Sequence, residues 1–443
     1  MPTVALSMIV RDEESSLPAC LESVKDLVDE ILIADTGSKD GTLKVARRYG
    51  ARCVSIPWED DFARARNRAL EEVRTDWVLY IDADEQLDEK AKLALPRLLK
   101  SSAADGYFVP EFDYVWSLNV KVWDFPTKPN QTGFAPAKRF PGYVEHAAVR
   151  LFRRRPGIYF VGRVHESVHP RILQTGGVMR KADFPIHHIG FACDGEIRIR
   201  KNLFYFQLLQ KKVQETPSDA QAHLQLGLSY FDNYRNFEAA LNCFVEACRL
   251  HPRFGTAWLY QGLTLRTLGH PAESLQALQR AKSLCGHSAD LAEGEGDAYY
   301  DLQDYDAARR SYKRALTYRN RWPAIESKLG LAEVRLGRTR AGLERLSRAV
   351  QEEPLNGDIH DRLIQACVWL DLLEEAAHAA DHKLSVAPPD PQSFLRAASI
   401  HARLEQRETA AQILRAGLCL FPHVERLQRC FLELAGPPSK SAI

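Results

Sequence analysis

The chain has 443 residues, more than one domain usually holds, so we expect two or three compact units. Its 59 lysines and arginines nearly balance its 58 aspartates and glutamates, which gives a formal net charge of +1. This balance argues against a general nucleic-acid binder and against a polybasic membrane-surface protein.

The cysteines and the N-terminal segment give information on the cellular compartment in which the protein resides. Nine cysteines are scattered along the chain without a CxxC pair, which favours a reducing, cytoplasmic setting. The opening MPTVALSMIVRDEE is apolar over too short a stretch for an export signal and lacks a basic start. No apolar run approaches the roughly 20 residues of a membrane-spanning helix. We therefore predict a cytoplasmic protein without a transmembrane segment.

Residues 3–112 alternate strand-like and helical stretches. The strand-like runs are TVALSMIV, DEILIADT, ARCVSIP, DWVLYIDAD and GYFVPEF. Between them, amphipathic helices are predicted over residues 15–28, 40–49, 61–74 and 88–100. Apolar strands separated by helices predict a mostly parallel α/β sheet covered on both faces. Ligands bind such sheets beyond the carboxyl ends of the strands, where the polar clusters RDEE, DTGSKDGT and DADE occur.

Residues 113–192 have a less regular pattern. Aromatic residues, proline and glycine are frequent, and the basic segment RLFRRRPG and the histidines His165, His187 and His188 follow. A long irregular segment in a compact domain is more often a functional lid or binding loop than filler. A disordered surface loop is the alternative.

From about residue 195 the pattern becomes helical and repetitive. Small residues recur at a step of 34, and the same phase continues to the end of the pattern, at Ala247, Ala281, Ala315, Ala349, Lys383 and Gly417. This helix-turn-helix period resembles the tetratricopeptide repeat. The resemblance implies an all-α solenoid of about six repeats with a concave binding surface.

Four ordered motifs in the first part of the chain carry a second resemblance. LSMIVRDEESSLPACLESV, DEILIADTGSKDGT, FARARNRAL and WVLYIDADE together resemble the family 2 glycosyltransferases of the GT-A fold. One departure is Ala69, where the family usually has glycine. The resemblance implies a Rossmann-like catalytic domain over residues 1–194. We predict a linker helix over 195–216 and the repeat domain over 217–436.

The segment VLYIDADEQL places Asp82, Asp84 and Glu85 directly after a strand, with no neutralising residue nearby in sequence. Acidic residues also close strands and open helices, which is the plainer explanation. The resemblance assigns Asp82 to the donor ribose and Asp84 to Mn²⁺ or Mg²⁺, which would bridge the diphosphate of a nucleotide sugar. We therefore expect the counter-charge of this cluster to arrive with the substrate.

Three further residues match nucleotide-side positions of the family. Glu13 of RDEE and Asp35 of ILIAD match nucleotide-contacting acids, and Arg66 of ARARN matches an arginine of the nucleotide pocket. Asp40 either contacts the nucleotide too or begins the helix at KDGT.

An inverting transferase needs a general base for the acceptor. VGRVHESV resembles a glycine-any-any-histidine-glutamate segment of bacterial family 2 enzymes that include lipopolysaccharide-core glucosyltransferases. The match implies that Glu166 is the base and His165 a pocket residue. Alternatively, Glu166 pairs with Arg163 or another nearby arginine and only holds the loop.

The segments IHHIGF and VRLFRRR supply the last candidates. The first resembles a strand end of related enzymes with repeats, which implies a histidine ligand for the cation, and we prefer His188 to His187. The second contains arginines that either face the diphosphate or an anionic acceptor or form a solvated basic strand: Arg150, Arg153, Arg154 and Arg155.

Taken together, the resemblances imply an inverting, metal-dependent hexosyltransferase that uses a nucleotide diphosphate sugar, most simply a UDP-hexose. The two-part architecture resembles the sublancin-type peptide S-glycosyltransferases, which implies a peptide or protein acceptor and a homodimer formed through the repeats. Lipid-linked and core-glycan enzymes share the catalytic motifs, so a glycan acceptor stays open. The alternative function is a catalytically inactive adaptor whose repeats scaffold a protein partner.

Overall fold

The computed structural model describes residues 2–101, 103–116, 121–122, 125–190, 195–318 and 322–435. The chain forms two compact units, Met1–Thr216 and Pro217–Ile443. Residue 194, where we predicted the first domain to end, and Gly436, where we predicted the repeats to end, lie outside the described residues, as does Cys193.

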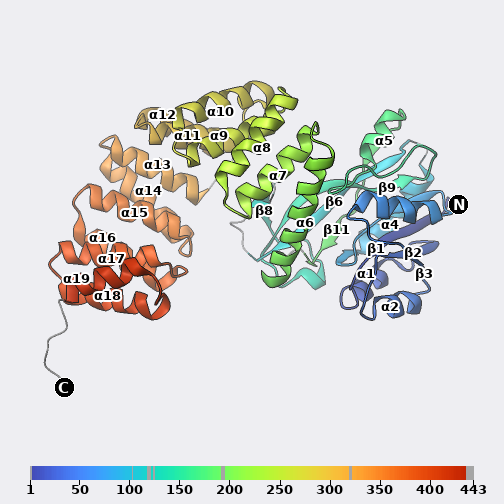
Figure 1. The fold of residues 1–443 in the computed structure, drawn as a ribbon, viewed down its shortest axis with the longest axis horizontal. Coiled ribbons are helices and arrows are strands. Elements are labelled where there is room, and N and C mark those ends of the chain that lie inside the picture. Colours follow the sequence, from blue (N-terminus) through green and yellow to red (C-terminus); the bar gives the residue numbers. More distant parts are fainter. Residues whose placement is uncertain are drawn as a thin grey trace, which may run out of the picture. The chain divides into compact units, whose positions relative to one another are not determined.

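The N-terminal unit is built on a sheet in which the strands follow the order β3-β2-β1-β4-β9-β6-β11-β5 (Figure 1). β10 also pairs with β6, and β8 pairs with β7 and β9. The strands are β1 (Val4–Val10), β2 (Glu30–Asp35), β3 (Arg52–Ser55), β4 (Trp77–Leu79), β5 (Glu85–Leu87), β6 (Gly106–Val115), β7 (Lys121–Val122), β8 (Phe125–Pro129), β9 (Gly142–Arg153), β10 (Met179–Lys181) and β11 (Ile186–His188).

The sheet is mixed. β3, β2, β1 and β4 are mutually parallel, as the alternating pattern predicts. β9 then runs antiparallel to both β4 and β6. The sequence analysis missed β9, because its Gly-Tyr start and its charged residues, among them Glu145, His146 and Arg150, hide the alternation of a strand. A substantial part of the segment predicted to be irregular is therefore a central strand.

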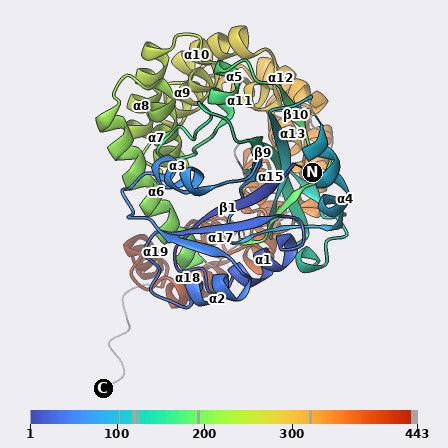
Figure 2. The same cartoon turned by 90° about the vertical axis from the view of Figure 1, so that its right-hand side faces the viewer.

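Helices cover both faces of this sheet. They are α1 (Leu17–Val24), α2 (Thr42–Arg48), α3 (Phe62–Glu72), α4 (Glu89–Lys100), α5 (His169–Gln174) and α6 (Gly195–Glu215), with a short 3₁₀ turn at Ala135–Ala137. One core joins the Leu6 and Met8 face of β1 to α1, α2 and α4. The other joins the Ala5 face and Leu32 of β2 to α3, so α3 lies across the sheet from α1 and α2 (Figure 2).

α6 packs on the N-terminal unit. Phe204 of α6 contacts Trp58 and Phe62, with ring centroids 5.9 and 6.3 Å apart. Two turns further on, Lys211 pairs with Asp60 at 2.9 Å. These contacts bring residues well beyond the sheet in sequence to the surface of the α/β unit.

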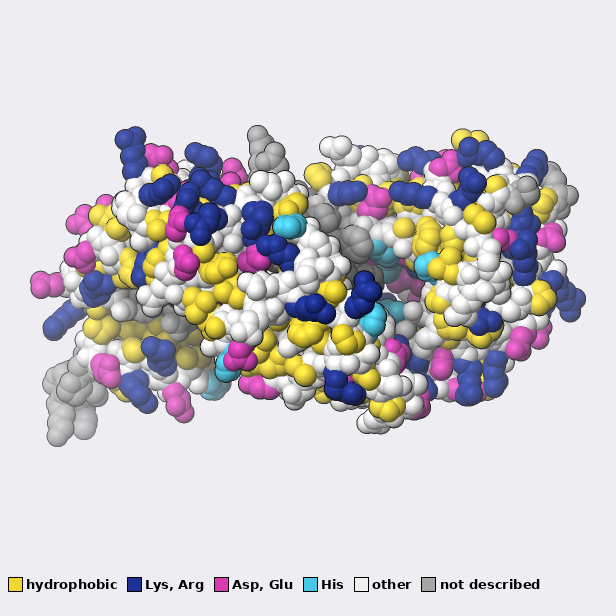
Figure 3. All heavy atoms as spheres, turned by 90° about the horizontal axis from the view of Figure 1, so that it is seen from above, with side chains coloured by type: hydrophobic (Ala, Val, Ile, Leu, Met, Phe, Trp, Pro, Cys, Tyr) yellow, Lys and Arg dark blue, Asp and Glu magenta, His cyan; other side chains and the backbone are white. Residues whose placement is uncertain are grey.

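The C-terminal unit consists of successive antiparallel helix pairs followed by a final helix. The helices are α7 (Ala220–Asp232), α8 (Phe237–Leu250), α9 (Gly255–Thr267), α10 (Pro271–Cys285), α11 (Ala289–Asp301), α12 (Tyr305–Tyr318), α13 (Pro323–Arg335), α14 (Thr339–Glu352), α15 (Gly357–Trp369), α16 (Leu373–Val386), α17 (Pro391–Arg403), α18 (Arg407–Leu420) and α19 (Glu425–Ala435). Basic and acidic side chains both occur across the face of the molecule drawn in Figure 3.

The 34-residue step in the sequence places glycines where the two helices of a pair come into contact. A Cβ on Gly262 would lie 2.8 Å from Leu278, and one on Gly296 would lie 2.6 Å from the ring of Tyr312, so each glycine lets a neighbouring helix approach. The series of residues from Ala247 to Gly417 is buried at every 34-residue step, including Lys383, where a charged residue occupies the position of an alanine. Its Nζ pairs with Asp361 at 2.9 Å, which compensates the buried charge.

None of the helices in the described part of the chain is long and apolar enough to cross a membrane.

Candidate active site

The acids of the DADE motif lie in the turn between β4 and β5. The backbone N–H of Asp82 donates to Glu85 Oε2 (2.7 Å), and the N–H of Glu85 donates to the carbonyl of Asp82 (3.0 Å). This reciprocal pair fixes the turn. It leaves the Asp82 side chain 42% exposed, while the Glu85 side chain is buried. Asp82 is therefore open to a ligand and Glu85 supports the backbone.

The cluster has counter-charges from distant parts of the chain. Arg66 of α3 donates to Asp82 Oδ1 at 2.7 Å, and Arg150 of β9 lies 3.8 Å from Asp82 Oδ2. The expectation that the counter-charge arrives with the substrate is therefore wrong for Asp82. Both arginines are candidates from the sequence, but their pairing with Asp82 was not predicted, because they lie 16 and 68 residues away along the chain.

Arg150 is the centre of a buried ionic network. Its guanidinium donates to both oxygens of Glu111 (2.9 and 2.8 Å) and to Glu85 Oε1 (2.8 Å). Burial raises the pKa of Glu85 to about 8, against the opposing charge of Arg150 and helped by the charges of Asp82 and Glu111. Arg150 is thus buried and stabilises the turn through its bond to Glu85, rather than facing solvent.

Asp84 lies beside His188 of β11. Asp84 Oδ2 is 3.4 Å from His188 Nε2, and His188 Nδ1 is 2.8 Å from Asp113 Oδ1 of β6. Asp113 is buried, and its other oxygen lies 2.8 Å from Nε2 of His146. Burial opposes ionisation of Asp84, yet the hydrogen bond and charge of His188 hold the pKa of Asp84 below its usual range.

This arrangement fits a divalent cation. Asp113 holds the imidazole through Nδ1 and orients it so that Nε2 points to Asp84, as carboxylates commonly do for metal-binding histidines. Within the described ranges no group of three His, Cys, Asp or Glu side chains is placed to hold a metal ion. Asp84 and His188 would therefore supply two ligands, and Mn²⁺ or Mg²⁺ accepts phosphate oxygens and waters at its other positions.

Gly190 makes room for this pair. A Cβ at Gly190 would collide with the Asp84 carboxylate, and the preceding Ile189 N–H donates to the Asp84 carbonyl at 3.3 Å. The chain after β11 therefore passes directly over Asp84, which only glycine permits.

Glu166 lies in a short closed loop. Val161 and Ser167 exchange two backbone hydrogen bonds of 3.0 Å, which closes residues 162–166 into a tight turn. His165 has a φ of +55°, in the left-handed region. Glu166 Oε1 accepts from Arg66 Nε at 2.5 Å. The alternative partner Arg163 pairs instead with Glu215 of α6, so Arg66 alone of these two arginines is bonded to Glu166.

The loops after β1 and β2 carry Glu13 and Asp35. Asp35 is buried and accepts from the N–H groups of Gly37 and Ser38 at 3.1 to 3.3 Å, so it shapes its own turn. Asp40 accepts from the N–H of Thr42 in the first turn of α2. Burial raises the pKa of Glu13, against the hydrogen bond that the Ser16 hydroxyl donates to its carboxylate.

Other candidates lie away from the cluster. Arg153 and Arg154 donate to backbone carbonyls of Ala104 and Thr75, and Arg155 pairs with Asp105. Of the two alternatives for these arginines, the contacts favour a basic strand over side chains that face the diphosphate. His187 is buried on the opposite face of β11 from His188, between aromatic rings, with Nδ1 2.7 Å from the hydroxyl of Tyr114.

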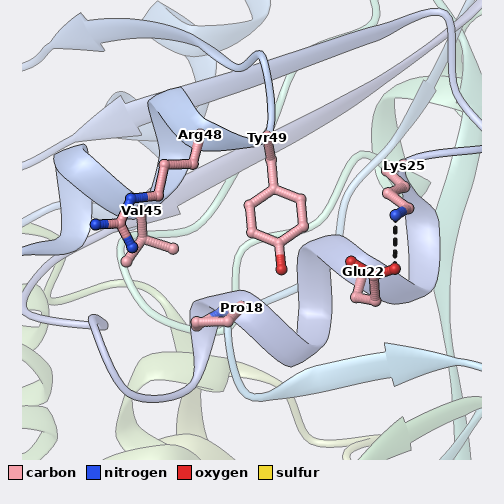
Figure 4. A pocket seen from close by; sticks show the side chains of 6 residues that line it. All are labelled: Pro18, Glu22, Lys25, Val45, Arg48 and Tyr49. Atoms are coloured by element: carbon pink, nitrogen blue, oxygen red, sulfur yellow. Dashed lines mark ion pairs between the residues drawn. The ribbon is translucent and has the colours of Figure 1, made fainter.

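A surface hollow of about 490 Å³ lies between α1 and α2. Figure 4 shows Tyr49 between Pro18 and the Glu22–Lys25 ion pair of 2.6 Å. None of the lining residues named for it belongs to the acid cluster.

The sequence analysis missed two residues of α6. Lys201 Nζ lies 3.6 Å from Asp84 Oδ2, and the Tyr205 ring is parallel to that of His165, with centroids 6.4 Å apart. Burial raises the pKa of Tyr205, helped by the charges of Asp82 and Glu166. A helix was predicted over residues 195–216, but it follows the last motif, so nothing in the sequence indicated that it contributes to the site. Asp113 was also missed, although two acids alternating in the apolar run YFVPEFDYV were a usable signal.

Comparison with known sequences gives the class of this site. Residues 6–156 match the family described as glycosyl transferase family 2. Residues 224–289 match a tetratricopeptide repeat and residues 296–337 a TPR repeat. The chain therefore carries a family 2 glycosyl transferase domain followed by tetratricopeptide repeats.

Among curated proteins, the chain is similar to a TPR repeat-containing protein of Synechococcus elongatus, with 34% identity over 51% of this chain and 52% of that protein. It is 31% identical to the lipopolysaccharide core biosynthesis glycosyltransferase LpsC of Rhizobium meliloti, over 38% of this chain and 59% of LpsC. It is 27% identical to the SPbeta prophage-derived glycosyltransferase SunS of Bacillus subtilis, over 38% of this chain and 35% of SunS. Each match thus covers less than two thirds of the relative.

Among solved structures, a tetratricopeptide repeat protein from Parabacteroides merdae aligns with 54% of this chain and 94% of its own, with 12% identity and a TM-score of 0.45.

Proposed function

We propose that the protein transfers a hexose from a nucleotide diphosphate sugar, a UDP-hexose in the simplest case, to an acceptor, with Mn²⁺ or Mg²⁺ as cofactor. The observation that carries the proposal is the arrangement of Asp84, Asp113 and His188, the first two of which lie within the residues that match glycosyl transferase family 2. A cation held there would act as a Lewis acid on the diphosphate. Glu13, Asp82 and Asp35 line the loops on the same side and are proposed to serve the nucleotide.

In the proposed reaction the acceptor heteroatom attacks C1 of the sugar and the bond from C1 to the phosphate oxygen breaks. The nucleotide diphosphate leaves with the bonding electron pair. The acceptor proton passes to Glu166, which inversion at C1 would place on the face opposite the leaving group. His165 precedes the base in the same loop and shapes the acceptor side.

Arg66 links the two sides of this site, because one guanidinium bonds both Asp82 and Glu166. It is buried, with Tyr80 4.9 Å and Phe160 5.8 Å from its central carbon. Arg66 is therefore proposed as a positioning residue that sets the spacing of donor and acceptor acids.

The proposed acceptor is a peptide or protein, with a glycan as the alternative. Support comes from the repeats, since solenoids of this kind hold extended peptides or partner proteins. The repeats would bind the acceptor or join two copies of the chain. The proposed setting is the cytoplasm, supported by the free thiols of the cysteines that the structure describes.

A second candidate function is a catalytically inactive domain that displays the repeats. It is favoured by the same Arg66, which neutralises both acids without any substrate. Thermal shift separates the two functions. An active donor site is stabilised by UDP and Mn²⁺ together, because both bind the folded state, whereas an inactive adaptor shows no shift with either.

A further inference from the structure

Lys201 lies beside Asp84, the proposed ligand of the cation. Its Nζ is 3.6 Å from Asp84 Oδ2. The Lys201 side chain is 49% exposed and the Asp84 side chain 19% exposed, so the ammonium lies on the solvent side of the carboxylate. Lys201 belongs to α6, beyond the residues 6–156 that the family 2 match covers.

The ion pair between Lys201 and Asp84 is loose. Its length exceeds the roughly 2.7–2.9 Å of a charge-assisted hydrogen bond. A lysine head group on a flexible four-carbon stem can change partners at little cost. The neighbouring Asp84 has a second, shorter partner in His188, at 3.4 Å. Lys201 therefore neutralises the outer side of Asp84 without being fixed there.

We propose that Lys201 binds the diphosphate of the nucleotide sugar and stabilises the negative charge that the nucleotide gains as it leaves. This inference rests on the proposed function. A divalent cation bound to Asp84 would displace the Lys201 ammonium from this carboxylate, because the two positive charges repel each other. A diphosphate bound to the cation would place a new negative charge next to Lys201. The flexible side chain would then let the ammonium pair with the diphosphate instead of Asp84.

The proposal has two consequences of opposite sign. With Mn²⁺ bound, loss of the ammonium lowers the affinity for a diphosphate. Without nucleotide, loss of the ammonium removes a competitor for Asp84, so Mn²⁺ alone binds more tightly. General damage to the site would weaken both.

The test is isothermal titration of the full chain with UDP at saturating Mn²⁺, with uridine, and with Mn²⁺ alone. The variants are Lys201→Met, which keeps an apolar stem of similar length, and Lys201→Arg, which keeps the charge. Lys211→Met is the matched control, since Lys211 lies on the same helix, is 44% exposed and pairs with Asp60.

We expect Lys201→Met to weaken UDP binding by about tenfold or more, the scale of a hydrogen bond to a charged group. Uridine affinity should not change, Mn²⁺ alone should bind more tightly than to the wild type, and Lys201→Arg should recover most of the UDP affinity. Lys211→Met should match the wild type in all three titrations.

Three results would overturn the inference. Equal UDP affinity of the wild type and Lys201→Met rejects Lys201 while leaving the proposed function standing. Parallel loss of uridine and Mn²⁺ binding shows that the substitution only disturbs the site. No binding of UDP by the wild type with Mn²⁺ rejects the proposed function, and the role of Lys201 with it.

Discussion

Arg66 and Glu166 are 100 residues apart in sequence and are joined by a hydrogen bond of 2.5 Å from Nε to Oε1. The Glu166 side chain is 11% exposed and that of Arg66 6%. The same guanidinium also bonds Asp82, at 2.7 Å from Nη2 to Oδ1. The proposed base is thus oriented before any substrate binds, which reduces the cost of ordering it in the reaction.

Replacing Glu166 by Gln tests its role as the base. The amide keeps the shape of the side chain but cannot take a proton. We expect transfer to fall by about 10²-fold or more, the usual scale of general-base contributions, with UDP affinity nearly unchanged. Single-turnover transfer and UDP titration measure the two quantities. Glu215→Gln is the control, because Glu215 pairs with Arg163 of the same loop and is 43% exposed. Unchanged transfer in Glu166→Gln would move the base elsewhere.

Asp84→Asn should remove the joint effect of UDP and Mn²⁺ on thermal stability while leaving the circular dichroism spectrum unchanged. The amide is a poorer cation ligand than the carboxylate and carries no charge. Asp183→Asn is a suitable control, since Asp183 pairs with Arg97 at the surface and is 56% exposed. A full UDP and Mn²⁺ shift in Asp84→Asn would show that the cation binds elsewhere.

Asp113→Asn tests the support of His188. Asp113 touches no substrate in the proposed site, yet it orients the imidazole, so we expect Mn²⁺ affinity in the presence of UDP to fall by about 10- to 100-fold. Glu145→Gln on the neighbouring β9 is the control, because Glu145 pairs with Lys128 near the surface. Unchanged Mn²⁺ affinity together with a lower unfolding midpoint would assign Asp113 a purely structural role.

Part of this site could be predicted from sequence and part could not. The acids at the ends of β2 and β4 were predictable, because a parallel sheet places the carboxyl ends of its strands at one edge. The pairing of Asp82 with Arg66 and Arg150 was not, since these residues meet only through the tertiary fold. The proximity of His188 to Asp84 was expected from the family resemblance alone, which assigned both to one cation.

The same contrast holds for the fold. The 34-residue step predicted the helix pairs because successive repeats use a similar local contact, as at Gly262 with Leu278 and Gly296 with Tyr312. β9 was missed because its register depends on two strands far away in sequence, β4 and β6. Its charged residues are buried only by those neighbours.

A buried ionic network in the repeats gives a prediction for stability against pH. Asp297 of α11 accepts from Tyr312 (2.8 Å), Lys328 (2.7 Å) and Arg266 (3.2 Å). Burial alone would raise the pKa of Asp297, but Lys328 and Arg266 lower it. A lowered folded-state pKa contributes stability above the unfolded value of about 3.9, and that stability is lost as the pH falls through the folded value.

Asp297→Asn should therefore lower the free energy of unfolding of the repeats by about 1–3 kcal/mol at neutral pH, because a buried ionic partner is lost. The difference from the wild type should shrink as the pH falls below about 4. Urea unfolding of the full chain, followed by circular dichroism at both pH values, measures it. The matched control Asp371→Asn removes an exposed pair with Arg403. A difference that stays constant with pH would contradict the assignment.

The most direct test of the central claim is electron paramagnetic resonance of Mn²⁺ bound to the wild type with UDP. The account predicts a nitrogen coupling from His188, lost in His188→Asn, and a phosphorus coupling from the diphosphate on the same ion. A bound Mn²⁺ that shows phosphorus coupling without nitrogen, or no bound Mn²⁺ at all, would contradict it.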